Sequence, residues 1–433
     1  MRMVDIIIKK RNGEKLSREE IKFVIDKYLA NEIPDYQISA LLMAIYFRGM
    51  DVEETSILTE KMAYSGKVVD LSCIPGIKVD KHSTGGVGDK TTLVFAPLIS
   101  AYGLPIAKMS GRSLGHTGGT IDKLESIPGF RTNLSFDEFV NQVKNIGISI
   151  VGQTENLVPA DKKIYALRDV TGTVDCIPLI ASSVMSKKIA GGSDVIVLDV
   201  KTGRGAFMPT FEMAEKLAEL MVNIGKKLNK KISAVISNMD EPLGNMVGNS
   251  LEVIEAIETL KGNGPQDLRE LVITLGTQAV LLSGKEKDEN KIRENLVKLL
   301  ENGSALRKFR ELISAQGGNE EVIDNYKLFP QAKIQKEIFS REEGYITKLD
   351  AYLIARSVMA LGAGRDKKDD VIDLSVGVKL HKKLGDKVQK NEPIVTFYAN
   401  DPEKLSIAQE IFKNAYEIGK EQIKKPLILK IIT

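Results

Sequence analysis

The chain has 433 residues, a length that suggests two or three structural units rather than one. With 43% hydrophobic and 27% charged residues, it has the composition of a water-soluble globular protein, which excludes a disordered or collagen-like chain. The 61 basic (Lys and Arg) and 58 acidic residues leave a net charge of +3 without a basic block, which argues against a nucleic-acid partner or an anionic membrane surface.

The first 65 residues are predicted to form a small helical lobe. Ser17 with Glu20, and Asp51 with Glu54, have the spacing of capping boxes, which begin helices. The most apolar stretch, residues 40–47, is hydrophobic all round, so we expect a buried helix there, with a dimer contact as the alternative.

Two strand, loop and helix units follow. A β-like run at 77–81 meets a glycine-rich turn at 82–89 and then a helical pattern. The same order recurs with an apolar run at 104–109, a glycine-rich loop at 110–119 and a helix from about Thr120. Two successive units of this kind predict neighbouring parallel strands with both loops at their carboxyl ends.

The rest of the chain is predicted to alternate helix and strand, and then to consist mainly of strands and turns. Residues 159–190 are predicted to be helical, 195–200 and 234–237 are continuous apolar strands, and helices with charged faces follow from 266 to 313. After about Gly344 the chain becomes rich in strands and turns, with a spacing similar to that of biotinyl and lipoyl carrier domains. No convincing counterpart of their modified lysine is present, so we expect a structural appendage, with a carrier role as the alternative.

The predicted fold class is α/β. We expect a small helical lobe made of two chain segments, a large α/β lobe with a mixed sheet, and a C-terminal α+β part resembling a biotinyl/lipoyl-like β fold. The expected boundaries are 1–67 and 158–191 for the helical lobe, 68–157 and 192–335 for the α/β lobe, and 336–433 for the C-terminal part.

The cysteines and the apolar segments bear on location. Cys73 and Cys176 are the only cysteines, and their spacing fits neither a disulfide framework nor a zinc cluster, so a cytoplasmic location is the simplest expectation. The N-terminal apolar run is too short for a secretory signal, and no segment approaches the roughly 20 apolar residues of a membrane helix.

The two glycine-rich loops are candidate anion sites. Nine of the 50 residues from 81 to 130 are glycine, which allows backbone N–H groups to approach an anion closely. Each loop is flanked by one lysine and two hydroxyl residues, which are Lys81, Ser83 and Thr92 for the first and Lys108, Ser110 and Thr120 for the second. They form a plausible cage for one phosphate, and the alternative is that both loops are packing turns. Neither loop carries a Walker A or dinucleotide fingerprint, which disfavours triphosphate and NAD.

A second group of polar residues lies on the returning helices. Tyr165 and Arg168 are spaced i, i+3, and Ser183 and Lys187 are spaced i, i+4, so each pair projects from one helical face and the four side chains can converge. His82, inside the first loop, is the histidine expected to take part in chemistry, with a structural hydrogen bond as the alternative.

A structural interpretation of the two helical cations is also open. Arg168 can simply pair with Asp169 or Asp161, and Lys187 can extend its apolar stem along the surface beside Lys188.

Three motifs carry a family resemblance. They are KHSTGGVGD at 81–89, SGRSLGHTGGTIDKLE at 110–125, and YALRDVT at 165–171 with SVMSK at 183–187. Together they resemble the thymidine and pyrimidine-nucleoside phosphorylase family, from one end of the chain to the other. The resemblance implies a homodimer whose lobes close over substrates. It also implies reversible phosphorolysis of uridine, thymidine or deoxyuridine to a free base and (2-deoxy)-α-D-ribose 1-phosphate, in pyrimidine salvage.

The resemblance also implies residue roles. Phosphate is expected on Lys81, Ser83, Thr92, Lys108, Ser110 and Thr120. The pyrimidine is expected on Tyr165, Arg168, Ser183 and Lys187, the last three also being catalytic, while His82 faces a base oxygen and supplies a proton. Lys108 favours an enzyme that accepts uridine as well as thymidine, because the thymidine-restricted branch tends to have Met there.

A monovalent cation belongs to the same expectation. The resemblance implies no organic cofactor but one K⁺ ion per subunit, held at positions matching Gly88, Lys90, Leu243, Met246 and Glu255. Lys90 departs from the hydroxyl residue usual at its position, which places an ammonium near the expected ion. The alternative activities are a thymidine-restricted phosphorylase and a phosphoribosyltransferase of similar fold. The transferase would need Mg²⁺ carboxylates, and the sequence places no acidic pair for them.

Overall fold

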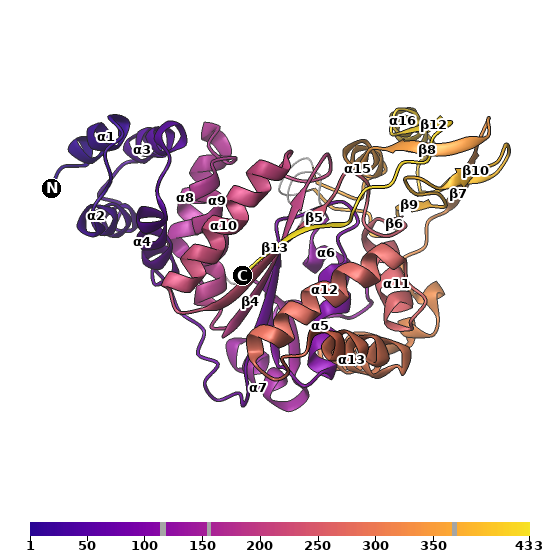
Figure 1. Cartoon of the computed structure of the whole chain (residues 1–433), viewed down its shortest axis with the longest axis horizontal. Helices are drawn as coiled ribbons and strands as arrows, with labels where there is room; N and C mark the ends of the chain where they lie inside the picture. Colours follow the sequence, from indigo (N-terminus) through magenta and orange to yellow (C-terminus); the bar gives the residue numbers. More distant parts are fainter. Residues whose placement is uncertain (113–117, 154–156, 366–369) are drawn as a thin grey trace.

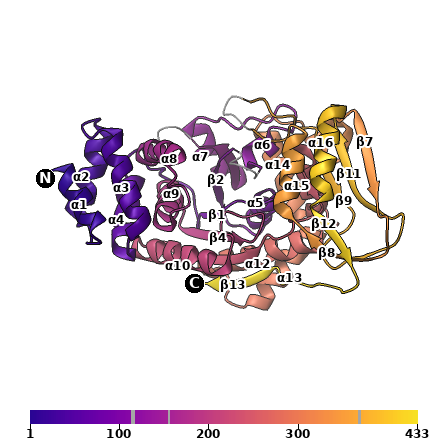
Figure 2. The same cartoon turned by 90° about the horizontal axis from the view of Figure 1, so that it is seen from above.

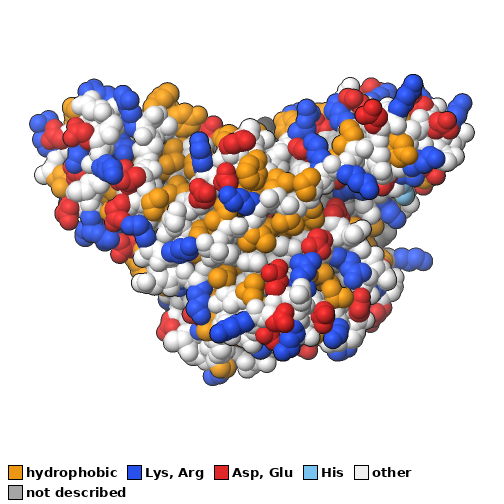
Figure 3. Space-filling model, in the orientation of Figure 1, with side chains coloured by type: hydrophobic (Ala, Val, Ile, Leu, Met, Phe, Trp, Pro, Cys, Tyr) orange, Lys and Arg blue, Asp and Glu red, His pale blue; other side chains and the backbone are white. Residues whose placement is uncertain are grey.

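The computed structural model describes residues 1–112, 118–153, 157–365 and 370–433. A helical lobe, an α/β lobe and a C-terminal α+β part follow one another along the length of the molecule (Figures 1 and 2). This architecture confirms the predicted fold class. Basic and acidic side chains are intermixed over the face drawn in Figure 3, in keeping with the small net charge.

The helical lobe combines two distant chain segments, as Figure 2 shows. Its helices are α1 (Met3–Arg11), α2 (Arg18–Leu29), α3 (Asp35–Arg48), α4 (Val52–Ala63), α8 (Pro159–Thr171) and α9 (Ile177–Ala190). Both predicted capping boxes are present, at the starts of α2 and α4. The prediction of a buried helix at residues 40–47 is wrong on one face, because Tyr46 and Phe47 are 37% and 75% exposed. Because this helix is apolar on every face, its sequence could not show which face would lack a packing partner.

The central sheet has six strands in the order β13-β5-β4-β1-β2-β3. They are β1 (Val79–Ser83), β2 (Ile106–Ser110), β3 (Ile148–Gly152), β4 (Val195–Thr202), β5 (Lys231–Asn238) and β13 (Ile428–Ile432). β1 pairs in parallel with β2, as the repeated strand and loop units predict, and with β4 on its other side. The strand order reverses beside β1, so its carboxyl end lies at a topological switch point, where open α/β sheets bind ligands.

Helices cover both faces of this sheet. They are α5 (Thr91–Ala101), α6 (Thr120–Leu124), α7 (Phe136–Ile146), α10 (Phe211–Lys227), α11 (Asn249–Leu260), α12 (Gln266–Ser283), α13 (Glu289–Glu301) and α14 (Ser304–Ala315). Along the fully buried β4, Val195 and Val197 belong to the core that includes α5 and α12, while Ile196 and Leu198 belong to the core under α10. This alternation is what a strand buried on both faces requires. No helix in the described ranges is long and apolar enough to cross a membrane.

In its described residues, the C-terminal part contains two helices and the strands of two small sheets, one of which also includes β6 from the α/β segment. The helices are α15 (Ala351–Ala360) and α16 (Pro402–Lys413), and the strands form β6-β9-β11-β7 and β10-β8-β12. The strand bounds are β6 (Met246–Val247), β7 (Ile334–Phe339), β8 (Gly344–Leu349), β9 (Gly377–Leu380), β10 (Lys387–Val388), β11 (Pro393–Ala399) and β12 (Tyr416–Gly419), with short 3₁₀ turns at Glu320–Ile323 and Tyr326–Leu328. The last strand, β13, leaves this part and pairs antiparallel with β5 in the central sheet. The end of the chain therefore completes a sheet whose neighbouring strand lies nearly 200 residues earlier.

Candidate active site

A cavity of about 720 Å³ lies between the helical lobe and the carboxyl ends of β1 and β2. Its volume is in the range of small-molecule sites. Ten of the eleven side chains predicted for substrate binding or catalysis line it: His82, Ser83, Thr92, Lys108, Ser110, Thr120, Tyr165, Arg168, Ser183 and Lys187. The structure therefore brings the loop residues and the helical residues to one cavity, while their individual roles stay predictions.

The first glycine-rich loop is closed by Asp89, a residue that the sequence did not single out. Its carboxylate accepts hydrogen bonds from the Ser83 hydroxyl and from the backbone N–H and hydroxyl of Thr91. Burial alone would raise the pKa of Asp89, but the ammonium groups of Lys201, Lys81 and nearby Lys123 hold it well below its usual value. The loop is therefore anchored by a permanently charged carboxylate.

Lys81 is the predicted residue that the structure does not place on the cavity. Its side chain is 1% exposed, and its ammonium donates to the Thr91 hydroxyl and lies 3.7 Å from Asp199 Oδ2 and 3.9 Å from Asp89 Oδ1. Lys201 Nζ, 2.9 Å from the same Asp199 oxygen, completes this buried cluster. In this structure Lys81 supports the loop from behind, because its ammonium is held by Thr91, Asp89 and Asp199.

Lys108 belongs to a buried triad of charges. Its Nζ lies 3.2 Å from Asp80 Oδ1, and Lys188 Nζ lies 2.7 Å from Asp80 Oδ2. Burial lowers the pKa of Lys108 to about 7, with Asp80 opposing the shift and Lys188 adding to it. Sequence reasoning missed Asp80 and Lys188. The only indication in the sequence was their position, since Asp80 directly precedes Lys81 and Lys188 directly follows Lys187.

Among the described residues, His82 is the histidine that lines the cavity. Burial, and then the charges of Lys188, Lys108, Lys187 and Lys81, hold its pKa well below the usual 6.5. The imidazole is therefore neutral near pH 7, so it offers one N–H donor rather than a charged acid.

Lys187 is held on the cavity by two neighbours. Its Nζ lies 2.7 Å from Asp161 Oδ2 on α8 and donates to the Ser183 hydroxyl at 3.0 Å, one turn earlier on α9. The structural alternative, in which Lys187 extends beside Lys188, is not what the structure shows, because Lys188 turns to Asp80 instead. Asp161 therefore pairs with Lys187, and not with Arg168 as the structural alternative had it.

Arg168 is fixed by the turn between α8 and α9. Its guanidinium donates to the backbone carbonyls of Thr173 at 3.2 Å, Val174 at 2.6 Å and Leu179 at 3.2 Å, and its buried position lowers its pKa. The Tyr165 ring lies beside it, 5.5 Å from the guanidinium carbon. Pairing with an aspartate, the structural alternative, is absent from the contacts of the described residues. Five donors in a rigid fork leave N–H groups for a ligand after three carbonyls are satisfied.

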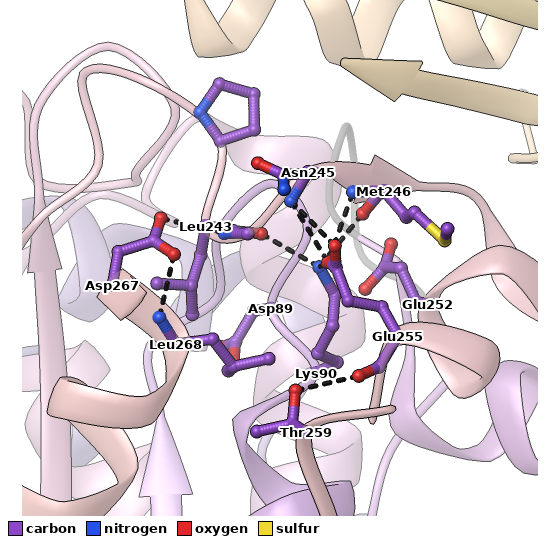
Figure 4. A network of polar contacts seen from close by, with 12 residues as sticks. Asp89, Lys90, Leu243, Asn245, Met246, Glu252, Glu255, Thr259, Asp267 and Leu268 are labelled. Atoms are coloured by element: carbon purple, nitrogen blue, oxygen red, sulfur yellow. Dashed lines mark hydrogen bonds and ion pairs between the residues drawn. The ribbon is translucent and has the colours of Figure 1, made fainter. Parts of the chain in front are cut away.

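The five positions expected around K⁺ also come together, behind the first loop (Figure 4). The ammonium of Lys90 lies at their centre and donates to Leu243 O, Met246 O and Glu255 Oε2. Because the ammonium takes the place that an ion needs, the residues present do not fit K⁺, and no step of catalysis is assigned to an ion.

Family comparisons agree with this architecture. The glycosyl transferase family model for the helical bundle domain matches residues 4–66, and the model for the a/b domain of that family matches residues 76–306. The model for the pyrimidine nucleoside phosphorylase C-terminal domain matches residues 345–419. The fold is similar to that of anthranilate phosphoribosyltransferase from Thermus thermophilus, with a TM-score of 0.57 and 18% identity over 72% of this chain and 98% of that chain. The class is therefore that of glycosyl transferases with a helical bundle and an α/β domain.

Curated relatives define the family within this class. Pyrimidine-nucleoside phosphorylase of Bacillus subtilis (strain 168) is 54% identical over 433 residues and all of both chains, and that of Geobacillus stearothermophilus is 54% identical over 414 residues and 96% of each chain. The protein of the same name from Staphylococcus aureus (strain N315) is 53% identical over all of both chains. The chain belongs to the pyrimidine-nucleoside phosphorylase family, which confirms the resemblance found in the motifs. It is an enzyme that transfers a pentosyl group to phosphate.

Proposed function

We propose that the chain catalyses the reversible phosphorolysis of pyrimidine nucleosides (uridine, thymidine and deoxyuridine) to a free base and (2-deoxy)-α-D-ribose 1-phosphate, in pyrimidine salvage. The observation that carries this proposal is the single cavity with loop hydroxyls and Lys108 on one side and Arg168 and Lys187 on the other. A phosphate and a heterocycle bound at these two sides have the pentose between them.

The reaction exchanges one bond for another at the anomeric carbon. The C–N bond breaks and leaves its electron pair on the base, while a phosphate oxygen forms the new C–O bond. Charge therefore develops in two places, positive on the sugar and negative on the base. Donors fixed before the reaction stabilise such charges most effectively.

The described side chains suit those two charges. The hydroxyls of Ser83, Thr92, Ser110 and Thr120, with the ammonium of Lys108, hold phosphate next to the cationic sugar. Arg168 and Lys187 carry the donors for the departing base anion, and the neutral imidazole of His82 has an N–H for a base oxygen.

A direct assay tests the proposal. The purified protein is incubated with uridine or with thymidine, with and without phosphate, and the ultraviolet change on release of the base is followed. We expect release only with phosphate and from both nucleosides. Release from thymidine alone would indicate the thymidine-restricted alternative. A third incubation contains uridine 5'-monophosphate and pyrophosphate, and base released there, with none released from the nucleosides and phosphate, would indicate the phosphoribosyltransferase.

The assembly and location are part of the same proposal. Exposed hydrophobic side chains lie on α1, α3 and α8, of which α3 contacts the other two, and they include Val4, Ile8, Tyr36, Phe47 and Val170. A face of this kind supports a homodimer. Light scattering is then expected to give about twice the 47.7 kDa of one chain, and Phe47→Glu to give the monomer mass. A cytoplasmic location remains the expectation from the two free cysteines.

A further inference from the structure

The ammonium of Lys90 has a complete set of partners. It lies 2.8 Å from Leu243 O, 2.9 Å from Met246 O and 2.6 Å from Glu255 Oε2, and the side chain is fully buried (Figure 4). A lysine ammonium has three N–H donors and no acceptor, so three oxygen atoms satisfy it fully.

The backbone approaches the ammonium and its oxygen partners closely at two glycines. Gly244 has φ +69°, and a Cβ placed there would lie 2.3 Å from Glu255 Oε2 and 2.9 Å from Lys90 Nζ. A Cβ at Gly88, with φ +70°, would lie 2.5 Å from Leu243 O. The cradle therefore closes tightly around the ammonium.

Charge balance leads to the same conclusion. The carboxylate of Glu255 is the acidic group in contact with Lys90, and its oxygens also accept the backbone N–H groups of Asn245 at 2.9 Å and Met246 at 3.1 Å. One positive charge already faces one negative charge. A second cation would be buried without a counter-charge, which is strongly unfavourable.

Lys90 connects the first glycine-rich loop to a distant part of the chain. Lys90 is the residue before α5, one residue after Asp89, which closes the first loop, and two before Thr92, which lines the cavity. Its partners lie on the chain between β5 and α11 and on α11 itself. The ammonium thus ties the candidate phosphate loop to the second half of the α/β lobe.

We infer that Lys90 is a built-in monovalent cation that makes this enzyme independent of K⁺. An ammonium carries the same single charge as K⁺ and is bound by carbonyl and carboxylate oxygens in the same way. The inference concerns the ion requirement of the fold, so melting temperature tests it without relying on the proposed function.

The first arm of the test uses the unmodified protein. After exhaustive dialysis against choline chloride, its melting temperature and its phosphate-dependent turnover are measured in choline chloride and in KCl at equal ionic strength. We expect the same melting temperature within about 1 °C and turnover within twofold. A melting temperature that rises with the logarithm of K⁺ concentration would overturn the inference, because it would show an ion bound beside the lysine.

The second arm compares two substitutions of the same residue. Lys90→Thr restores a hydroxyl and leaves space among the three oxygens, whereas Lys90→Met fills that space with a side chain of similar length that has no charge. We expect Lys90→Thr to melt lower than the unmodified protein in choline and to recover with K⁺. Lys90→Met should melt lower in both salts.

Three results of this arm would contradict the inference. They are no K⁺ response in Lys90→Thr, an equal K⁺ response in Lys90→Met, and no loss of stability in either variant. If neither variant folds, the comparison of salts on the unmodified protein still decides. Absence of phosphorolysis together with the expected melting results would reject the proposed function and leave this inference intact.

Discussion

Lys188 Nζ lies 2.7 Å from Asp80 Oδ2, and this buried ion pair joins residues 108 positions apart in the chain. Asp80 is on β1, three residues before Ser83, and Lys188 is on α9, directly after Lys187. The second Asp80 oxygen faces Lys108 on β2. The strands that carry the candidate phosphate residues are therefore fixed by charge to the helix that carries the candidate base residues.

Asp80→Asn should destabilise the fold strongly. The substitution leaves two buried ammonium groups without their carboxylate, and breaking a buried pair in this way costs about 3–5 kcal/mol. Urea unfolding followed by circular dichroism measures the loss. Asp5→Asn, on the exposed side of α1, is the matched control and should change stability by less than about 0.5 kcal/mol. Equal stability of the two variants would show that the triad contributes nothing to holding the lobes together.

Lys187→Ala should reduce turnover and also lower stability. The Lys187 side chain is 24% exposed, but its ammonium faces Asp161, which is 5% exposed and would lose its counter-charge. Loss of one fixed donor to developing charge lowers kcat by about 10²–10³. Steady-state kinetics with uridine measure the effect. Lys216→Ala, an exposed lysine of α10, should retain full activity. Wild-type kinetics in Lys187→Ala would mean that the base site is elsewhere.

Arg168→Ala should lose both turnover and stability, through lost backbone contacts rather than a lost ion pair. Its guanidinium satisfies two backbone carbonyls of the turn between α8 and α9 and that of Leu179 on α9, and each lost hydrogen bond to a charged group costs about 1.5–3 kcal/mol. A lower urea midpoint together with lost turnover is expected. If Arg168→Ala keeps its midpoint, the guanidinium is not what orders this turn.

Local sequence patterns were enough to predict the elements and most of the cavity. The capping boxes of α2 and α4, the parallel pair β1 and β2, and the facing pairs on α8 and α9 all rest on spacing within about 30 residues. Short-range spacing fixes which side chains share a face, and the fold then brings these faces together.

The features that the sequence did not predict depend on partners far apart in the chain. Lys188 and Asp80 look like an ordinary surface lysine and a strand-end aspartate until α9 packs beside β1. Lys90 stood out as an unusual residue, but only the loop at 243–246 shows what its ammonium binds. Strand β13 is short and only partly buried, so its own sequence pattern did not predict a place in the central sheet. Its pairing with β5 shows that place.

Lys108→Met should shift the enzyme toward thymidine. The family resemblance of the motifs implies Lys here in the pyrimidine-nucleoside branch and Met in the thymidine-restricted branch, so we expect kcat/KM for uridine to fall more than kcat/KM for thymidine. A loss of about 10-fold or more is expected for uridine, because an ionic hydrogen bond is removed from the cavity. Both nucleosides are assayed at saturating phosphate. An equal fall for both would assign Lys108 to phosphate binding alone.

The pH dependence of phosphate use should report the unusual pKa of Lys108. Burial lowers this pKa to about 7, so the ammonium is charged below pH 7 and loses its proton as the pH rises through that value. Because kcat/KM for phosphate reflects groups of the free enzyme, it should decline above pH 7, by nearly tenfold per pH unit once most of the lysine is neutral.

Lys108→Arg isolates this effect from the ionisation of phosphate itself. Arginine stays charged throughout the range, so the variant should lack the decline that comes from the side chain, while the ionisation of phosphate affects both proteins equally. The measured quantity is the ratio of kcat/KM for phosphate, variant over wild type, from pH 6 to 9. We expect this ratio to rise with pH. A ratio that stays constant across the range would show that Lys108 keeps its proton in the free enzyme, and that Asp80 outweighs burial in setting its charge.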